Sequence, residues 1–152
     1  MFREPDLKNR KRTGISFTGL LHRIAVTLDT NIAKLTTEEA PREGTIRLSG
    51  ERPVFKVGEI SLEHIMLPKR GGLLQANIHI VPPDEASDGL IEHVGEEVGF
   101  VLEGSLELVL GSERHLIQAG DAFYFSSQTP HGYCNVGKFT ARIFWVNKPA
   151  TF

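Results

Sequence analysis

The sequence contains one cysteine, Cys134, among its 152 residues, so no disulfide can form within the chain. The absence of disulfides is typical of a reducing compartment, and we therefore expect a cytoplasmic protein. No apolar run approaches the roughly 18 to 20 residues that span a bilayer, and the first residues lack the apolar core of a secretory signal. The sequence thus predicts no association with a membrane.

A strong net charge is also absent, because 17 Lys and Arg residues face 19 Asp and Glu residues. This balance argues against a nucleic-acid-binding or membrane-surface protein along the whole chain. Residues 1–12 are locally basic, and such a start could contact phosphates, although a solvated terminus is the simpler interpretation. Neither a phosphate-binding glycine loop nor a Ser-His-Asp pattern is present.

The composition is that of a folded domain, with 40% hydrophobic residues, and the hydrophobic period changes once along the chain. Residues 16–39 have a helical period, which predicts one helix from Ser16 and a short second helix that ends before Pro41. Two helices of this size cannot bury their apolar faces alone. We therefore expect residues 1–42 to be a helical segment that packs on the rest of the chain or on a second copy.

The remainder, residues 43–152, shows short strand patterns separated by turn residues every eight to twelve positions. The predicted strands are 45–49, 53–57, 60–67, 73–81, 91–94, 97–103, 105–110, 113–118, 122–126, 131–135 and 139–147. Gly111-Ser112 predicts a hairpin between two of them. This pattern indicates a mainly β protein with one antiparallel sandwich or barrel, and the polar loop 82–89 could form one rim of a pocket.

The first residues that could bind a metal or a ligand lie in the stretch HVGEEVGFVLEG, residues 93–104. Side chains alternate between the two faces of a strand, so an inward His93 implies further inward positions. With a turn or bulge at Gly95, these positions are Ile91, Glu97, Gly99 and Val101. Glu96 should then point outward. Together with the distant His131, His93 and Glu97 are the ingredients of an imidazole–carboxylate metal site.

These blocks resemble the two conserved motifs of the cupin superfamily. The first family motif is roughly G-x5-H-x-H-x3/4-E-x6-G, and its second His, its Glu and its last Gly match His93, Glu97 and Gly104. The second motif, G-x5-P-x-G-x2-H-x3-N, is matched at Gly120, His131 and Asn135, with Ser126 and Gln128 in place of its Pro and middle Gly. The resemblance implies a cupin-type antiparallel β-barrel, also called a jelly roll or double-stranded β-helix.

One departure from the family pattern bears directly on function. Metal-binding cupins use two His and one Glu from the first motif and one His from the second, but Ile91 stands where the first His would be. The remaining His93, Glu97 and His131 can still hold a divalent metal such as Zn, Fe, Mn or Ni. Because Ile91 also places an apolar group against the metal position, we favour a pocket without a metal cofactor. In it Glu97 meets a cationic amine ligand or pairs with a protonated histidine, because an unpaired buried carboxylate is costly.

The resemblance extends beyond the general fold. The run from HVGEEVGFVLEG through GDAFYFSSQTPHGYCN to WVNKPATF is similar to the C-terminal sensor domain of Xre-type helix-turn-helix regulators, in particular the group of the putrescine-responsive repressor. The stretch GISFTGLLHRIAVTLDTNIAKL is similar to the last two helices of their DNA-binding unit. Either the start codon is misassigned or that unit is truncated. The chain as given lacks the helix that enters the DNA groove, so we do not expect it to bind DNA specifically.

Three hypotheses about function follow. The first, which we favour over an enzyme, is a homodimeric sensor domain whose pocket binds an amine or amino-acid-like metabolite. We expect that ligand to contact His93, Glu97 and His131, with Val101 and His79 beside them. The second hypothesis is a small metal-dependent enzyme, a dioxygenase or isomerase, that uses the same three residues. The third is a filled barrel without a ligand. For the single histidines His22 and His64, we expect a surface or structural role.

Overall fold

The computed structural model describes residues 20, 23–24, 46–66 and 73–150. These residues form one short 3-10 helix, η1 (Ser49–Glu51), and nine strands. The strands are β1 (Val54–Val57), β2 (Ile60–Met66), β3 (Gln75–Val81), β4 (Glu96–Glu103), β5 (Ser105–Leu110), β6 (Glu113–Gln118), β7 (Ala122–Ser126), β8 (His131–Cys134) and β9 (Ala141–Lys148). The prediction of a mainly β protein is therefore confirmed.

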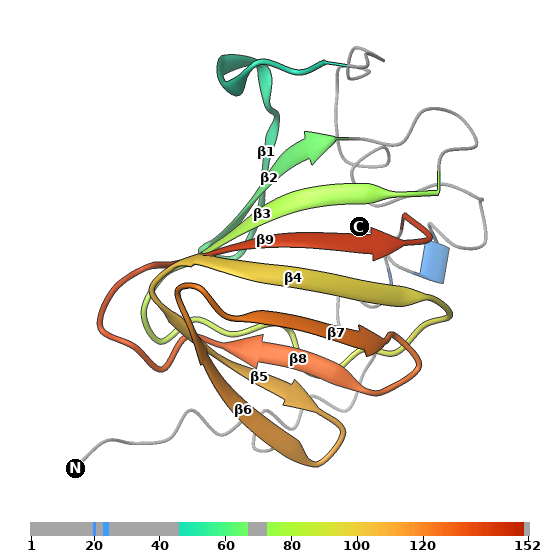
Figure 1. Ribbon diagram of the computed structural model, residues 1–152, viewed down its shortest axis with the longest axis vertical. Helices are drawn as coiled ribbons and strands as arrows, with labels where there is room; N and C mark the ends of the chain where they lie inside the picture. Colours follow the sequence, from blue (N-terminus) through green and yellow to red (C-terminus); the bar gives the residue numbers. More distant parts are fainter. Residues whose placement is uncertain (1–19, 21–22, 25–45, 67–72, 151–152) are drawn as a thin grey trace.

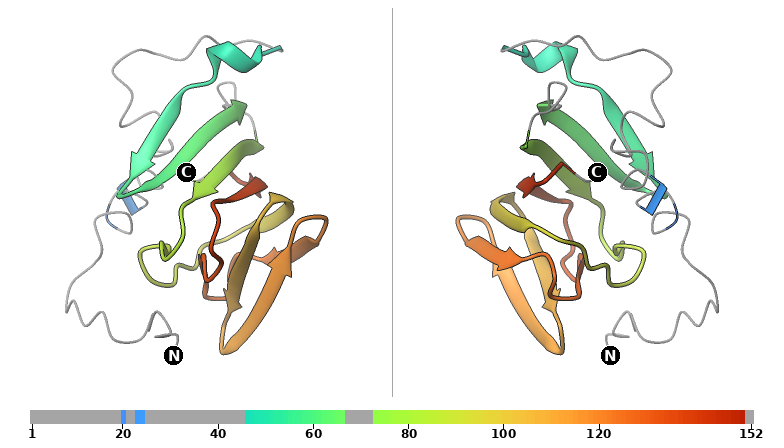
Figure 2. Two further views of the ribbon diagram at one scale, coloured as in Figure 1. Left: turned by 90° about the vertical axis from the view of Figure 1, so that its left-hand side faces the viewer. Right: turned by 90° about the vertical axis from the view of Figure 1, so that its right-hand side faces the viewer.

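The strands form two antiparallel sheets (Figure 1). The six-stranded sheet has the order β1-β2-β3-β9-β4-β7, and the three-stranded sheet has the order β6-β5-β8. The smaller sheet lies against the end of the larger sheet that carries β4 and β7, as the side views in Figure 2 also show. The hydrophobic core between them includes the fully or almost fully buried Val101, Leu106, Leu108 and Ile143.

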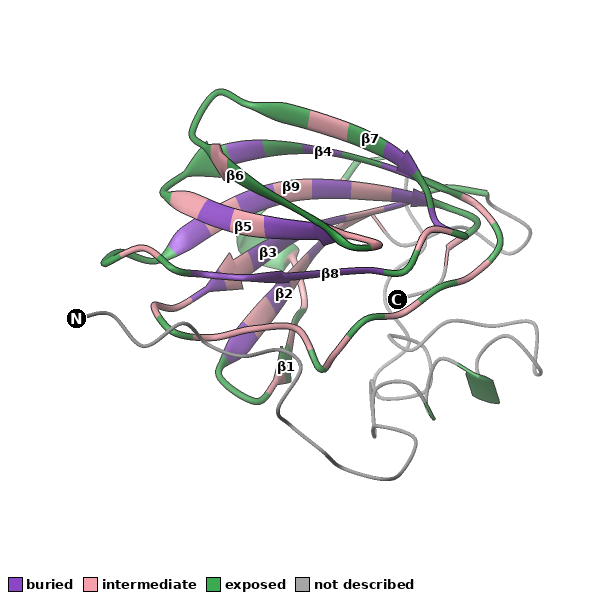
Figure 3. Cartoon of the chain, turned by 90° about the horizontal axis from the view of Figure 1, so that it is seen from below, coloured by how far each residue is buried: buried purple, intermediate pink, exposed green. Residues whose placement is uncertain are grey.

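Burial along the central strands follows the two-residue period of a sheet with one face covered. In β4 and β9, buried residues alternate with more exposed ones over most of the strand (Figure 3). Glu97, Gly99 and Val101 consequently point to the interior, while Glu96 points to solvent, as the sequence predicts. The inner face of β4 thus carries both a core residue and a carboxylate.

Most strand predictions agree with the structure to within a residue or two, and the hairpin at Gly111 joins β5 to β6 as predicted. Two strand predictions are wrong. Residues 46–48 are not a strand, and their apolar side chains Ile46 and Leu48 are 80% and 63% exposed, so no neighbouring strand covers them. Residues 91–94 contain only an isolated bridge, from Ile91 to His131.

The break between that bridge and β4 has a local cause at Gly95. This residue has a φ of 136°, and a Cβ atom there would lie 2.1 Å from the backbone oxygen of Lys148. The chain can therefore turn sharply at this position only with glycine. The turn ends the pairing that begins at Ile91 and sets the direction in which β4 starts.

The helical segment predicted at residues 1–42 lies outside the described residues except for Leu20, Arg23 and Ile24, which are helical and exposed. The basic cluster of residues 8–12 also lies outside them. Within the described part of the chain, no helix has the length and apolar character needed to cross a membrane.

Candidate metal and ligand site

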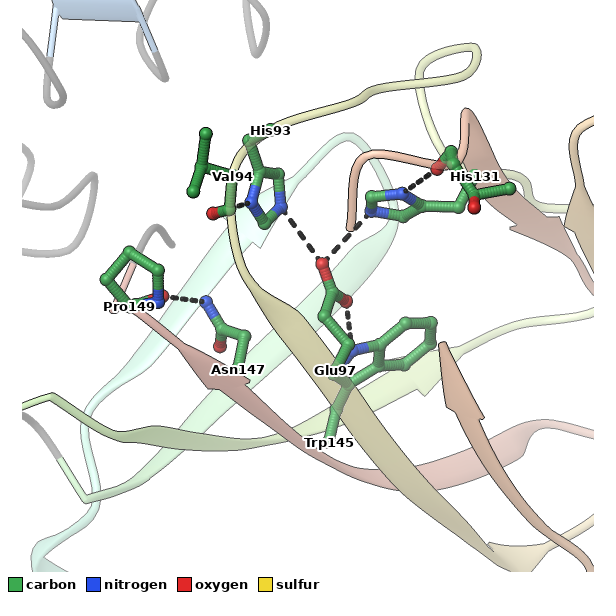
Figure 4. Close-up of polar contacts among 8 residues, drawn as sticks. His93, Val94, Glu97, His131, Trp145, Asn147 and Pro149 are labelled. Atoms are coloured by element: carbon green, nitrogen blue, oxygen red, sulfur yellow. Dashed lines mark hydrogen bonds and ion pairs between the residues drawn. The ribbon is translucent and has the colours of Figure 1, made fainter. Parts of the chain in front are cut away.

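The three residues predicted to form a site come together from three separate segments (Figure 4). Glu97 is on the inner face of β4, His93 is in the segment before it, and His131 is the first residue of β8 in the other sheet. Two backbone hydrogen bonds of 2.9 Å between Ile91 and His131 join the segment that precedes β4 to the start of β8. This link brings the two histidines to the same end of the interior.

Both imidazoles converge on one oxygen of the carboxylate. Nε2 of His93 lies 2.9 Å from Oε1 of Glu97, and Nε2 of His131 lies 3.1 Å from the same atom. The three side chains are 5%, 4% and 2% exposed for His93, His131 and Glu97, and their candidate ligand atoms all lie within 4.8 Å of one another. Among the described residues, this is the group whose donors could together bind a metal ion.

Backbone contacts define which nitrogen of each ring carries a proton. Nδ1 of His131 is 2.8 Å from the carbonyl oxygen of Thr129, and Nδ1 of His93 is 3.2 Å from that of Val94. Because a carbonyl oxygen can only accept, both Nδ1 atoms must donate. In neutral imidazoles the two Nε2 atoms then direct lone pairs toward Oε1 of Glu97. That arrangement fits a bound cation, since metal-ligating histidines commonly donate their other N–H in this way.

The second oxygen of Glu97 has a different partner. The indole Nε1–H of Trp145, on β9, donates a hydrogen bond to Oε2 of Glu97 at 2.5 Å. Burial raises the pKa of this carboxyl, but the imidazoles of His131 and His93, when their Nε2 atoms carry a proton and donate to it, lower the pKa by more. The net pKa is well below the usual range, so the group is an ionised carboxylate. Trp145 therefore leaves Oε1 as the oxygen that faces the histidines.

His79, which the sequence places beside the ligand, lies behind Trp145. Its ring is stacked on the indole at 4.9 Å between centroids, and its Nδ1 is 3.0 Å from the hydroxyl of Tyr133. Burial lowers the pKa of His79 to about 4, although the Glu97 carboxylate raises it in part. Burial also raises the pKa of Tyr133. Both groups are therefore neutral at neutral pH.

The other predicted site residues take different places. Val101 is fully buried in the hydrophobic core, two positions further along the inner face of β4 than Gly99. Ile91 is half-buried and contacts His131 through its backbone. Since Ile91 supplies no donor atom, the three remaining ligands would leave coordination positions open for a small molecule.

Several buried residues with hydrogen-bonding groups near the site are not predicted by the sequence analysis. Trp145 is one, and four more lie on the inner face of the large sheet: His64, Gln75, Asn77 and Asn147. The alternation along β3 and β9 could have assigned the last three to the interior. Their proximity to Glu97, however, depends on the pairing of β3, β9 and β4, which are distant in the sequence.

Comparison with known proteins identifies the domain. Residues 77–147 match the family model described as "Cupin domain". The transcriptional regulator PuuR of Escherichia coli (strain K12), of the helix-turn-helix type, is 31% identical over 70 residues, which are 46% of this chain and 38% of the regulator. An uncharacterized protein of Methanocaldococcus jannaschii, MJ1618, is 28% identical over 79 residues, which are 51% of this chain and 63% of that protein. The similarity thus spans less than half of the regulator.

Solved structures agree with this assignment. Hydroxypropylphosphonic acid epoxidase from S. wedmorenis has a TM-score of 0.61 and 27% identity, covering 88% of this chain and 75% of the enzyme. An RmlC-like cupin from Shewanella frigidimarina NCIMB 400 has a TM-score of 0.62 and 15% identity, covering 73% of this chain and 96% of that one. Residues 77–147 therefore form a cupin domain, and the fold of this chain is that of the cupin superfamily.

Proposed function

We propose that this chain is a ligand-sensing cupin domain of a transcriptional-regulator-type protein, with a divalent metal ion at the centre of its ligand site. His93, Glu97 and His131 would hold the ion. The observation that carries the proposal is that Nε2 of both imidazoles lies within 3.1 Å of one carboxylate oxygen while each Nδ1 faces a backbone carbonyl, an arrangement that suits a cation bound between the three side chains. Zn, Fe, Mn and Ni all accept two imidazoles and one carboxylate.

The charge of this centre favours one of the ligand types that the sequence predicts. Both oxygens of Glu97 already have neighbours, namely the two imidazoles at Oε1 and the indole N–H at Oε2. A divalent ion beside a single carboxylate keeps a net positive charge. An amino-acid-like ligand, which can present its own carboxylate to the ion, therefore suits the site better than a simple amine.

The similarity to a regulator supports the sensor part of the proposal. The family match over residues 77–147 includes the segment that carries Glu97. In such a protein, ligand binding would shift the packing between the cupin domain and the predicted helical segment at residues 1–42 through contacts that differ between two states. A cytoplasmic location, which the single cysteine fits, belongs to the same proposal.

A homodimer is the assembly that we propose. The outer face of the large sheet carries apolar side chains that are partly open to solvent, with Val98, Phe100 and Tyr124 being 45%, 42% and 66% exposed. The strand register places Val98 opposite Val146 on β9 and opposite Tyr124 on β7, which makes the apolar face continuous across three strands. Such a face is suited to self-association about a two-fold axis.

A second candidate function is a small metal-dependent enzyme, because the same two imidazoles and one carboxylate are the ligand set of non-haem iron oxygenases. The 27% identity with an epoxidase over 88% of this chain favours it specifically. A bound metal would supply a Lewis-acidic or redox centre. In this chain Trp145 would orient Glu97, and the rings of Phe125 and His131, 4.8 Å apart, would limit access of water.

Metal content tests the proposal directly. We would purify the protein without a metal-chelating step, load it separately with Zn, Fe(II), Mn and Ni, dialyse it and determine the metal by elemental analysis. The expected result is about one ion per chain for at least one metal, lost in Glu97→Ala and retained in His115→Ala. His115 is a suitable control because it lies on β6 and its side chain is 46% exposed. Wild-type protein that retains none of the four metals would contradict the proposal.

The two candidate functions separate in a second step. Amino-acid-like compounds would be screened for an increase in the melting temperature of the metal-loaded protein, since a ligand of the native state stabilises it. A compound that stabilises the protein and remains unchanged supports the sensor. Consumption of oxygen or chemical conversion of that compound, lost in His131→Ala, supports the enzyme.

A further inference from the structure

The inner face of the large sheet carries a polar wall beside the candidate metal site, formed by His64, Gln75, Asn77 and Asn147. The strand register fixes its position. Glu97 is opposite Asn147 on β9, which in turn is opposite Gln75 on β3. In the next inward row, Trp145 is opposite Asn77 on β3, which is opposite His64 on β2. The polar wall therefore extends across β9, β3 and β2 in the same two cross-strand rows that contain Glu97 and Trp145.

These four side chains are buried as deeply as the hydrophobic core. They are between 0% and 2% exposed, and the same inner face of β2 carries the core residues Ile60 and Leu62 further along the strand. Buried polar groups lower stability unless their hydrogen bonds are made, so apolar residues would be the simpler filling. A group of four polar residues at this place needs a reason beyond packing.

His64 has one hydrogen-bonding atom for which the described part of the chain provides no partner. Its Nδ1 lies 2.7 Å from Oδ1 of Asn77, and because an amide oxygen only accepts, Nδ1 is the donor. Burial lowers the pKa of His64 by more than the hydrogen bond with Asn77 raises it, and Arg47 lowers it further, so the ring is neutral and Nε2 is an acceptor. That Nε2 atom is buried and makes no hydrogen bond with the described residues.

We infer that His64, oriented by Asn77, is a second contact for the ligand of the metal site and accepts a hydrogen bond from its hydroxyl or amino group. This inference rests on the proposed function, because the two contacts would share one ligand. β3 and β9 lie between β2 and β4, so these two strands are about 14 Å apart across the sheet at roughly 4.8 Å per strand, and His64 is one inward row, about 7 Å, away from Glu97 along the strands. Both side chains are on the inner face, so a ligand that contacts both must span this gap.

The ligand class follows from the two ends of this site. An anionic group, such as a carboxylate, binds at the metal, and a hydroxyl or amino group some atoms away donates to Nε2 of His64. Hydroxy acids and amino acids in which the donor is separated from the carboxylate by a short carbon chain meet both requirements. A monofunctional acid or a diamine meets only one.

The test uses the zinc-loaded protein and a homologous series of ω-hydroxy and ω-amino acids with two to six carbons. Each compound is paired with the unsubstituted acid of the same length, and affinities are measured by calorimetry. At one chain length, the compound with the donor should bind at least about tenfold more tightly than its partner, the effect of one good hydrogen bond. His64→Leu and His64→Met should abolish this ratio and leave the affinity for the unsubstituted acid unchanged.

Controls separate this inference from the proposed function. His115→Leu, at an exposed histidine, should keep the ratio, and one zinc ion per chain together with an unchanged circular dichroism spectrum shows that a variant is folded. A ratio that persists in both His64 variants, or no preference for the donor at any length, would overturn the role of His64. Wild-type protein that retains none of Zn, Fe(II), Mn and Ni would instead overturn the metal site itself.

Discussion

At the scale of single residues, Trp145 has a larger role than its position in the core suggests. It is the only tryptophan of the chain, it is 4% exposed, and it donates to the carboxylate oxygen that does not face the histidines. The hydrogen bond fixes the rotation of the Glu97 carboxylate. Oε1 is thereby directed at both imidazoles, and the site has one defined oxygen for a metal.

Trp145→Phe should weaken metal binding by about 10- to 100-fold, the usual effect of removing a hydrogen bond to a metal ligand. The phenyl ring keeps most of the packing, so the metal stoichiometry at saturation should remain one. Competition with a chelator measures the affinity. Tyr124→Phe is a matched control, because Tyr124 donates to the neighbouring Glu96 on the outer face. Equal affinities in wild type and Trp145→Phe would contradict this role.

His79 should make the protein less stable in weak acid. Burial lowers its pKa from 6.5 to about 4, so the unfolded chain binds a proton over this range and the native state does not. Stability is therefore complete above about pH 6.5 and falls as the pH decreases toward 4, by at most about 3 kcal/mol. Urea denaturation at several pH values should show a smaller decrease for His79→Gln than for wild type. A decrease of the same size in both proteins would show that His79 is not its source.

The residues of the site differ in how far the sequence predicts them. His93, Glu97 and His131 follow from motif spacing, because the ligands of one site must recur at fixed places on a strand pair. Trp145 and His64 do not follow from the motif spacing. Their hydrogen-bond partners, Glu97 and Asn77, are 48 and 13 positions away, and no pattern of residues predicts those contacts. Only the register of β2, β3, β9 and β4 brings them together.

At the scale of elements, the pair of β4 and β7 shows how one glycine shapes the interior. Gly99 is opposite Phe123, and a Cβ atom at Gly99 would lie 2.1 Å from the tip of the phenyl ring. The ring therefore occupies the space of the absent side chain. From there it contacts Trp145, with centroids 4.7 Å apart, and so supports the indole that holds Glu97.

Gly99→Ala should destabilise the protein by about 1 to 3 kcal/mol, because the methyl group displaces the phenyl ring from a packed interior. Phe123→Leu in the same chain should restore part of this loss, since the shorter side chain gives the methyl group room. The free energy of unfolding in urea measures both effects. Gly50→Ala is the control, because nothing lies within 4 Å of a Cβ atom there. Additive effects of the two substitutions would argue against the contact.

Prediction of individual strands succeeds best for the hairpin-connected strands β5, β6 and β7. β5, β6 and β7 were predictable to the residue because adjacent hairpin strands share a local pattern of alternation and a turn glycine. The two failures, at 45–49 and 91–94, have strand-like side chains but lack a pairing partner along the segment. Propensity alone does not supply such a partner, because pairing is a tertiary property.

At the scale of the whole molecule, the apolar outer face of β9, β4 and β7 is the feature that the fold of one chain leaves unexplained. Phe100 lies on it, opposite Phe144 on β9, and is 42% exposed. The inner face of the same strands carries the core and the candidate metal site. We therefore expect the outer face to bind a second copy of the chain.

Phe100→Glu should convert the proposed dimer into a monomer, as measured by size-exclusion chromatography with light scattering. A two-fold interface contains each residue twice, so this one substitution places two carboxylates in an apolar contact, where burying each charge is costly. Leu116→Glu is the matched control, since Leu116 is 70% exposed on β6 of the other sheet and should leave the dimer intact. Metal stoichiometry should stay at one per chain in both variants, because the site lies on the opposite face of β4. A wild-type monomer, or a Phe100→Glu dimer, would show that this face has another partner.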